Sequence, residues 1–502
     1  MSDGTIAVAG SAERAGAGAL VRSLGLLDAT MIVIGSMVGS GIFIVSADIA
    51  RQVHSPGLLL IVWLVTGAMT VIGALCYGEL AAAMPAAGGQ YVYLREAFGP
   101  LWGFLYGWTM LLIIQTATIA AVAIAFARFT GVLIPWFSSA TWLWQIGTFG
   151  PYRLWFGELG PYTVGLNTQN LLAILSIIVL TWVNLRGIRT GALVQNVLTL
   201  TKTGALLGVI VLGVVFATDR ALTANFGHFW EPAQPSTGRA DWVGLLTMIG
   251  VAMVGSLFAA DAWNNVTFVA GEVRDPERNL PRSLALGTGL VIAIYLLANL
   301  AYLCVLPLRG APDGATALER GIQFAAEDRV ATAVAEVVLG HSGGVLMAIA
   351  VMISTFGCNN GLILAGARIY YAMAKDRMFF ASVGALNRHL APSLALLMQG
   401  AWASVLCLSG TYGQLLDFLI FSVLLFYILT IGGVFVLRRT RPEMARPYRT
   451  WGYPVLPALY IVMALFIEIQ LLRYKPQYTW PGLLLVLLGI PVYWVWKKAT
   501  KR

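Results

Sequence analysis

Seven residues near the start of the chain read Gly35-Ser-Met-Val-Gly-Ser-Gly41, with three glycines between apolar helical turns. A second unusual segment reads Ser256-Leu-Phe-Ala-Ala-Asp-Ala-Trp-Asn-Asn265, and it places one acid and two amides in the second half of a long apolar stretch. Gly-dense or polar backbone inside a membrane is buried in protein or lines a cavity, because its hydrogen bonds need partners there. Both segments therefore predict interrupted membrane helices.

The composition supports a membrane protein. Of the 502 residues, 58% are hydrophobic and 11% are charged, against about 25% charged in an ordinary soluble domain. Too few charged residues remain to cover the surface of a soluble protein of this size, so apolar surface must face lipid. High hydrophobicity and only four cysteines exclude a disordered chain and a disulfide scaffold. The basic residues behind the net charge of +9 lie in short gaps between apolar stretches, which indicates a topology signal and no nucleic-acid partner.

The hydropathy pattern predicts an all-α polytopic membrane protein. A hydrocarbon core about 30 Å thick needs roughly 20 apolar residues for each helical crossing. Twelve stretches qualify, and we expect transmembrane helices near residues 24–50, 57–83, 100–129, 168–185, 191–217, 242–270, 283–307, 343–374, 393–410, 415–437, 454–473 and 480–496.

The distribution of basic residues predicts the orientation. Summed over alternate gaps, 21 of the 32 Lys and Arg residues fall on the side of both termini, among them four after helix 8: Arg368, Lys375, Arg377 and Arg388. An excess of Lys and Arg in short loops marks the cytoplasmic side. We therefore expect a multi-pass protein of the cell membrane, with residues 1–23 as a flexible cytoplasmic tail and 497–502 as a basic cytoplasmic tail.

The two interrupted helices occupy matching positions, as helices 1 and 6. A Gly/Ser-rich face also allows close helix packing, and Asp261 can also cap a helix end. Packing alone does not predict interruptions in the first helix of each half, whereas an inverted-repeat transporter with a site at the membrane midplane does. We expect a 5+5 inverted repeat, with residues 24–217 as the first five helices, 242–437 as the second five, and 454–496 as helices 11 and 12.

The interruptions expose backbone groups that suit a zwitterion. Unwinding of helix 1 leaves N–H groups at Ser40 and Gly41 at the positive start of the second half-helix, which suits a carboxylate. Carbonyl groups at Met37 and within residues 258–261 can then accept hydrogen bonds from an ammonium group. An α-amino acid carries these two charges at this separation, so the pattern predicts an amino acid site.

Lys202 lies about eleven residues into helix 5, near the midplane. An ammonium group inside a membrane costs roughly a few kcal/mol, so a functional role is the default. Snorkelling of the side chain to an interface is the alternative. We expect its partners to be freed carbonyl groups of helix 1 and the hydroxyl of Ser354 or Thr355 in helix 8.

Residues 131–166 form the longest stretch outside the predicted helices. Its aromatic residues suit lipid-headgroup depth, and an interfacial packing loop is the simpler interpretation; they are Trp136, Trp142, Trp144, Tyr152 and Trp155. The four cysteines fall within predicted helices and are most simply small packing residues: Cys76, Cys304, Cys358 and Cys407. The four histidines lie in separate loops without metal-ligand spacing, so no metal and no cofactor is expected.

Several motifs match a known group of transporters: Gly35-Ser-Met-Val-Gly-Ser-Gly-Ile-Phe43, Tyr77-Gly-Glu-Leu80 with Gly88-Gly-Gln-Tyr-Val-Tyr93, residues 258–265 followed by Glu272-Val-Arg-Asp-Pro-Glu-Arg-Asn-Leu-Pro281, and Arg446-Pro-Tyr-Arg-Thr-Trp-Gly-Tyr-Pro454. With them the chain resembles the amino acid, polyamine and organocation transporter superfamily and, within it, the L-type amino acid transporter family. The resemblance extends from about residue 20 to 497.

The resemblance implies a five-plus-five inverted-repeat fold with two extra C-terminal helices, and transport by alternating access. By similarity, the amides of Ser40 and Gly41 hold the substrate carboxylate. The amino group is held by three carbonyl groups, Phe258 also acts as the outer gate, and Asn264 is a second pocket candidate; the three carbonyl groups belong to Met37, Phe258 and Asp261. Lys202 matches a basic position that takes the place of a sodium ion in sodium-coupled relatives, which implies sodium independence.

The chain departs from animal members in one respect. They join a glycoprotein through a cysteine between helices 3 and 4, and no cysteine occurs in residues 131–166 here. We therefore expect a prokaryotic-type transporter without a disulfide-linked heavy chain.

Together these patterns favour a sodium-independent exchanger of neutral L-amino acids, whose partners are the amino acid substrate and the lipid bilayer. The alternative is a proton-coupled amino acid or polyamine permease, in which Glu79 or Asp261 titrates; pairing with a cytoplasmic basic residue is the simpler interpretation of Glu79. An enzyme is disfavoured, because no catalytic residues, nucleophile–base pair or metal motif are found. A channel is disfavoured because two interrupted helices suit an occluded site better than a continuous pore.

Overall fold

The computed structural model describes residues 20–154, 157–159, 161–231, 242–408 and 412–499. Eleven helices of this part are long and apolar enough to cross a membrane, so the chain is a multi-pass membrane protein. The elements that carry these crossings are α1 (Leu26–Met37) with α2 (Gly41–Val53), α3 (Pro56–Ala83), α5 (Pro100–Thr109) with the π-helical η1 (Met110–Ile114) and α6 (Gln115–Leu133), α7 (Thr168–Leu185), α8 (Ile188–Val215), α10 (Trp242–Ala259), α12 (Pro276–Val305), α15 (His341–Lys375), α17 (Tyr412–Thr440), α18 (Val455–Tyr474) and α19 (Pro476–Ala499).

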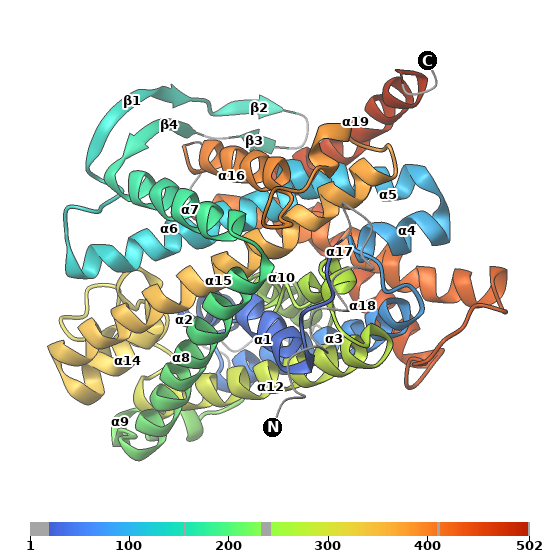
Figure 1. Cartoon of the computed structure of the whole chain (residues 1–502). Helices are drawn as coiled ribbons and strands as arrows, with labels where there is room; N and C mark the ends of the chain where they lie inside the picture. Colours follow the sequence, from blue (N-terminus) through green and yellow to red (C-terminus); the bar gives the residue numbers. More distant parts are fainter. Residues whose placement is uncertain (1–19, 155–156, 160, 232–241, 409–411, 500–502) are drawn as a thin grey trace, which may run out of the picture.

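Shorter helices connect the long ones, and each is too short to cross a membrane. They are α4 (Gln90–Phe98), α9 (Asp219–Phe226), α11 (Asn265–Phe268), η2 (Ala270–Glu272), α13 (Ala317–Arg320), η3 (Ala326–Asp328), α14 (Val330–Leu339), η4 (Ala381–Gly384) and α16 (Ser393–Cys407). In Figure 1, α9 and α14 lie at the left end of the bundle and α4 lies at the right end. Helices α9 and α14 thus mark one end of the bundle, and α4 marks the other.

Most of the predicted helices agree with the structure within a few residues, but α12 begins at Pro276 and not near residue 283, and a further difference lies near residues 393–410. There α16 spans 15 residues, which is short for a crossing. The count of twelve crossings, the inverted repeat and the cytoplasmic side of both termini stay predictions. Both predicted interruptions are present. The first interruption is residues 38–40, between α1 and α2, and the second interruption is residues 260–264, between α10 and α11.

The fold is mostly helical, as predicted, but the stretch expected to be a loop contains β-structure in residues 142–167. The long strand β1 (Trp142–Phe149) pairs antiparallel with β4 (Tyr162–Asn167), and the short β2 (Tyr152–Leu154) pairs with β3 (Gly157–Leu159). Aromatic residues and Thr favour strands, which explains the difference. The aromatic residues expected at headgroup depth are exposed, namely Trp136, Trp142, Trp144 and Tyr152, while Trp155 lies outside the described residues.

The helix with the first interruption lies at the centre of the bundle. Its apolar window, in α1 and α2, is 89% buried, whereas that of α19 is 28% buried. Helix α1 packs against α12, α8 and α15, and α2 packs against α10. A central position keeps the open backbone groups of the interruption away from lipid, as mid-membrane backbone requires.

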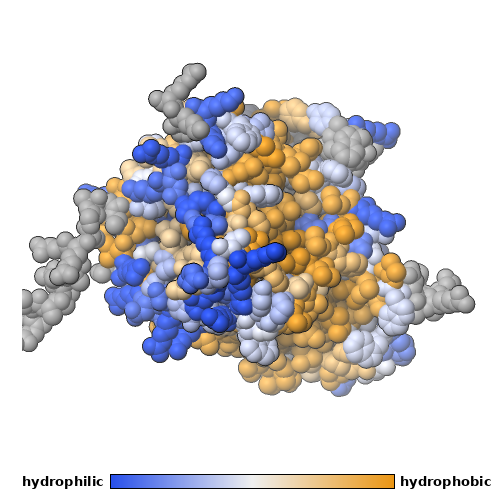
Figure 2. Space-filling view, turned by 90° about the vertical axis from the view of Figure 1, so that its right-hand side faces the viewer, coloured by the Kyte–Doolittle hydropathy of each residue, from blue (hydrophilic) through white to orange (hydrophobic). Residues whose placement is uncertain are grey.

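The start of α1 is tied to the segment that follows the second interruption. The amides of Ser23 and Leu24 donate to the carbonyl oxygen of Glu272 at 2.8 and 2.9 Å, and the amide of Arg274 donates to the carbonyl oxygen of Leu24 at 2.8 Å. The end of the predicted tail is therefore anchored, and residues 1–19 lie outside the described residues. Figure 2 looks onto the end of the molecule that carries α4 and shows hydrophilic side chains gathered beside a broad hydrophobic area.

Candidate functional site

The first interruption touches the end of α10. Helix α1 ends at Met37, and α2 begins at Gly41 with Ser40 as its buried N-terminal cap. A Cβ atom on Gly41 would lie 2.5 Å from the Cβ of Ala259, the last residue of α10. Glycine at this position therefore allows the two interrupted helices to meet, in addition to the predicted approach of a carboxylate.

Tyr295 joins the two interrupted helices. Its buried hydroxyl, on α12, lies 3.0 Å from the carbonyl oxygen of Met37 and 3.1 Å from that of Ala259. The hydroxyl donates to both carbonyl groups, so the Met37 carbonyl predicted to hold a substrate amino group has a protein donor in this structure. Tyr295 is not among the predicted site residues, although Tyr295, Asn299 and Tyr302 form one polar face of an apolar helix.

The second interruption is a tight turn around Asp261. The amide of Asp261 donates to the carbonyl oxygen of Phe258 at 3.1 Å, and Ala262 has a positive φ of 64°. Phe258, the predicted gate, is 7% exposed in the last turn of α10. The Tyr427 hydroxyl donates to the Asp261 carboxylate at 2.5 Å. Asp261 is therefore part of the turn and is also held from α17.

Asn264 connects the second interruption to two further helices. Its side-chain amide donates to Gln90 Oε1 at 3.0 Å, and Gln90 in turn donates to Thr430 Oγ1 at 2.9 Å. All three residues are buried. The predicted pocket residue thus belongs to a polar chain that runs from the interruption through α4 to α17.

A cavity of about 330 Å³ lies against the second interruption. Its polar lining includes Gln90, Tyr106, Gln115, Asp261, Asn264 and Tyr427. A second cavity of about 310 Å³ is also lined by Asp261 and Tyr427, together with Trp263 and Tyr460. Residues of α1 and α2 do not line either cavity in the described part of the chain. The predicted carboxylate-binding amides therefore do not line this open space themselves.

Lys202 is fully buried and donates to the backbone of the helix with the first interruption. Its Nζ lies 2.5 Å from the carbonyl oxygen of Gly35, 2.6 Å from that of Val38 and 3.5 Å from that of Ser354. The predicted carbonyl partners are confirmed. The predicted hydroxyl partners are wrong, because the Ser354 hydroxyl donates to Val38 and Gly39, and the Thr355 hydroxyl donates to Val351 within its own helix.

Cys358 also donates to the helix with the first interruption, and Gln195 packs closely against it. The Cys358 thiol donates to the carbonyl oxygen of Ser36 at 3.0 Å. A Cβ atom on Gly35 would lie 1.9 Å from Nε2 of Gln195, so glycine allows α8 to approach α1 closely. Asn360 donates to Oε1 of the same Gln195 at 3.0 Å. The carbonyl groups of residues 35–39 therefore have donors on α8, α12 and α15.

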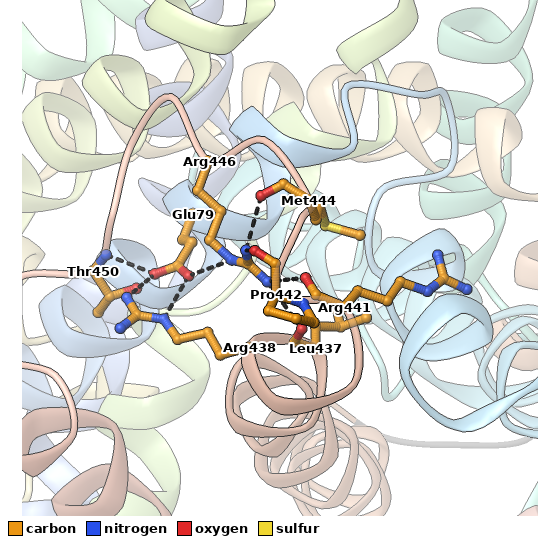
Figure 3. A network of polar contacts seen from close by, with 8 residues as sticks. All are labelled: Glu79, Leu437, Arg438, Arg441, Pro442, Met444, Arg446 and Thr450. Carbon is orange, nitrogen blue, oxygen red and sulfur yellow. Dashed lines mark hydrogen bonds and ion pairs between the residues drawn. The ribbon is translucent and has the colours of Figure 1, made fainter.

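Glu79 pairs with basic residues at the α4 end of the molecule, which agrees with the predicted pairing and not with a free titrating carboxylate. Its carboxylate accepts hydrogen bonds from the Arg438 guanidinium at 2.8 and 2.7 Å and from the Thr450 amide at 2.7 Å. Arg446 lies 3.6 Å away and anchors the turn after α17 by donating to backbone carbonyl groups. Figure 3 shows these groups converging on one carboxylate. Glu79 thus joins α3 to the segment between α17 and α18.

Arg368 is counted with the basic residues after helix 8, although its position falls within the predicted range 343–374. In the structure it lies inside α15, and its guanidinium Nε is 3.3 Å from the Glu272 carboxylate. Both side chains are 1% exposed. The predicted place of Arg368 in a cytoplasmic loop is wrong, because a buried carboxylate of the segment after the second interruption neutralises it within the bundle.

Comparison with known proteins shows which family and which characterised proteins the chain resembles. A family model described as amino acid permease matches residues 24–493. The chain is 30% identical over 486 residues to the human large neutral amino acids transporter small subunit 2, which covers 95% of this chain and 81% of that protein. It is 30% identical over 500 residues to the human Asc-type amino acid transporter 1, covering 98% of this chain and 86% of that protein. It is 28% identical over 484 residues to the human b(0,+)-type amino acid transporter 1, covering 95% of this chain and 88% of that protein.

Proposed function

This chain belongs to the amino acid permease family, and on that premise we propose that it exchanges neutral L-amino acids across the cell membrane without sodium, by alternating access. The names of two relatives support an amino acid substrate, and one of them, a large neutral amino acids transporter, supports neutral amino acids. We propose further that both termini face the cytoplasm. The excess of basic residues on that side supports the orientation.

The substrate site of this proposal is the meeting point of the two interruptions. The carboxylate binds the amides of Ser40 and Gly41, at the positive start of α2. The ammonium group donates to the carbonyl oxygens of Met37, Phe258 and Asp261. Since a carbonyl oxygen has two lone pairs, Met37 can accept from the ammonium while Tyr295 still donates to it.

The cavity beside Asp261 and Asn264 accommodates the substrate side chain in this proposal. Its mixture of polar and apolar lining residues suits a substrate side chain. Phe258, at the end of α10, is the residue that closes over bound substrate.

The contact between Lys202 and α1 is the observation that most directly supports exchange without sodium. A fixed ammonium group donates to the carbonyl oxygen of Gly35 in α1 and to that of Val38 in the first interruption. A bound cation would be held by such carbonyl oxygens in an interrupted helix. Because the protein supplies this charge itself, a coupling cation has no vacant position there, and substrate on the opposite side becomes the driving partner.

Uptake into proteoliposomes tests the proposal. Vesicles filled with unlabelled leucine should take up labelled leucine at the same rate in sodium and in choline buffer, and empty vesicles should take up little. The chain is reconstituted alone, because we also propose that it works without a disulfide-linked partner: its four cysteines lie in helices of the bundle. Strict dependence of uptake on sodium would contradict the proposal.

A proton-coupled permease for amino acids or polyamines is the second candidate. The observation that favours it is the position of the Asp261 carboxylate, which lines two cavities within the bundle. Glu79 does not favour it, because the Arg438 guanidinium and the Thr450 amide occupy its carboxylate. Uptake into empty vesicles that follows an imposed pH gradient and is lost in Asp261→Asn would establish the second candidate in place of exchange.

A further inference from the structure

A cavity of about 500 Å³ lies at the end of the molecule that carries α14, away from the candidate substrate site. Residues from α13 to the start of α15 and the end of α6 line it. Its principal lining residues are Val132, Arg320, Arg329, Thr332, Glu336 and His341. Arginine, threonine and histidine make this lining rich in hydrogen-bond donors.

The cavity lies at the depth of lipid headgroups. One apolar crossing ends at Leu133, and another begins at His341, so both crossings end beside the cavity. Apolar side chains next to it face outward, since Leu339 is 45% and Leu346 is 60% exposed. A molecule bound here thus has a charged cavity at one end and an apolar helix surface at the other.

The charges of the cavity are incompletely matched among the described residues. Glu327 pairs with both Arg128, at 3.3 Å, and Arg329, at 3.5 Å, so one carboxylate serves two arginines. Burial lowers the pKa of Arg329; Glu327 opposes this effect, and repulsion from Arg128 adds to it. The buried Nε of Arg320 and the buried hydroxyl of Thr332 have no hydrogen-bond partner in the described part of the chain.

Two donors without partners in a polar cavity point to an absent acceptor. Arg320 and Arg329 exceed the one lining carboxylate, Glu336, by a single positive charge. A phosphodiester carries one negative charge and several acceptor oxygens, and guanidinium groups bind it well. We propose that this cavity binds the phosphate of an anionic phospholipid, with Arg320 and Thr332 as donors and an acyl chain along α15 past Leu346. The apolar flank favours a lipid over a soluble carboxylate such as an amino acid.

Native mass spectrometry of the full chain tests this proposal without using transport. The protein is released from micelles that contain phosphatidylglycerol or phosphatidylcholine, and bound lipid is counted as a function of lipid concentration. We expect retention of one phosphatidylglycerol with about tenfold preference over phosphatidylcholine, which corresponds to one charge-assisted interaction.

Two variants and one control test whether lipid binding depends on this cavity. Arg320→Gln removes the unmatched charge, and Ala326→Trp fills the exposed rim of the cavity while leaving both arginines in place. Arg220→Gln removes an exposed arginine of α9 outside the cavity. We expect about tenfold weaker phosphatidylglycerol binding in the first two variants and wild-type binding in the control. Equal binding in all four proteins would overturn the proposal, as would displacement of the lipid by millimolar leucine in wild type.

Discussion

In the first interruption, backbone carbonyl groups accept hydrogen bonds from side chains of three other helices, whereas the second interruption is closed mainly by its own backbone. Lys202, Tyr295 and Ser354 donate to carbonyl oxygens of residues 35–39. In the second interruption the Asp261 amide donates to Phe258, and the Asn265 amide donates to Ala262. Its side chains point toward α4 and α17 and line the cavity beside them.

Because of this difference, substitutions around the two interruptions should affect transport in different ways. Side chains of α8, α12 and α15 fix the geometry of the first interruption from outside, so their loss should disturb the movement of helix 1 more than substrate contact. Side chains of the second interruption themselves face open space. Their loss should therefore change substrate affinity and selectivity more than turnover.

Lys202→Ala should have the largest effect. It leaves the buried Gly35 carbonyl group without its charged donor and the Val38 carbonyl group with only the Ser354 hydroxyl, and loss of such a donor costs about 1–3 kcal/mol. Turnover of leucine exchange should fall at least about 100-fold, while the Kd for leucine changes less than about threefold. The exposed Lys498→Ala is the control. Lost binding with normal cycling would contradict the role given to Lys202.

Gly41→Ala should come next, through packing at the meeting point of the interruptions. The new Cβ would lie within 2.7 Å of both the Cα and the Cβ of Ala259, so the helices must separate, and overpacking of this kind costs about 1–3 kcal/mol. We expect a lower Tm and weaker leucine binding. Gly204→Ala on α8 is the matched control, because nothing lies within 4 Å of the added atom. Equal Tm values for the two variants would contradict the close contact.

Tyr295→Phe should reduce turnover about tenfold, since it removes one hydroxyl that serves both interruptions. Tyr302→Phe is the control on the same helix, because its hydroxyl contacts only the Ile42 carbonyl oxygen, at 3.4 Å, among its described hydrogen bonds. Initial exchange rates at saturating leucine measure the difference. If both variants lose activity equally, the bridge between the interruptions has no special role.

Asn264→Ala should have the smallest effect and should change affinity. The variant opens the cavity and leaves Gln90 without its donor, so the KM values for leucine and alanine should shift by about three- to tenfold, and by different amounts. The maximal rate should stay close to that of wild type. The exposed Thr223→Ala on α9, which also shortens a polar side chain to alanine, is the control. A reduced maximal rate with unchanged KM values would contradict the different roles given to the two interruptions.

The sequence predicts the features that depend on local composition. Glycine density between residues 35 and 41 marks the first interruption, and Asp261 marks the second, because both conflict with a continuous apolar helix. The position of Lys202 also suffices to predict carbonyl partners, since a buried ammonium requires acceptors.

Features that depend on pairing between distant helices could not be predicted. The contacts of Tyr295 and Cys358 with α1 and of Asn264 with Gln90 each join residues more than 170 positions apart. The hydropathy pattern also does not fix how their helices are rotated about their axes. The strands in residues 142–167 lacked a clear signal because their apolar residues also suit the membrane interface. The pairing of Arg368 with Glu272 was missed because Arg368 was counted with the basic residues of the following loop and because the two residues lie 96 positions apart.

A cryo-EM structure with bound leucine tests the proposed substrate site. We expect density for the carboxylate at the amides of Ser40 and Gly41, for the ammonium group at the carbonyl oxygens of Met37, Phe258 and Asp261, and for the side chain in the cavity beside Asn264. Leucine held wholly within that cavity by the side chains of Asp261 and Asn264, without contact to the first interruption, would contradict it.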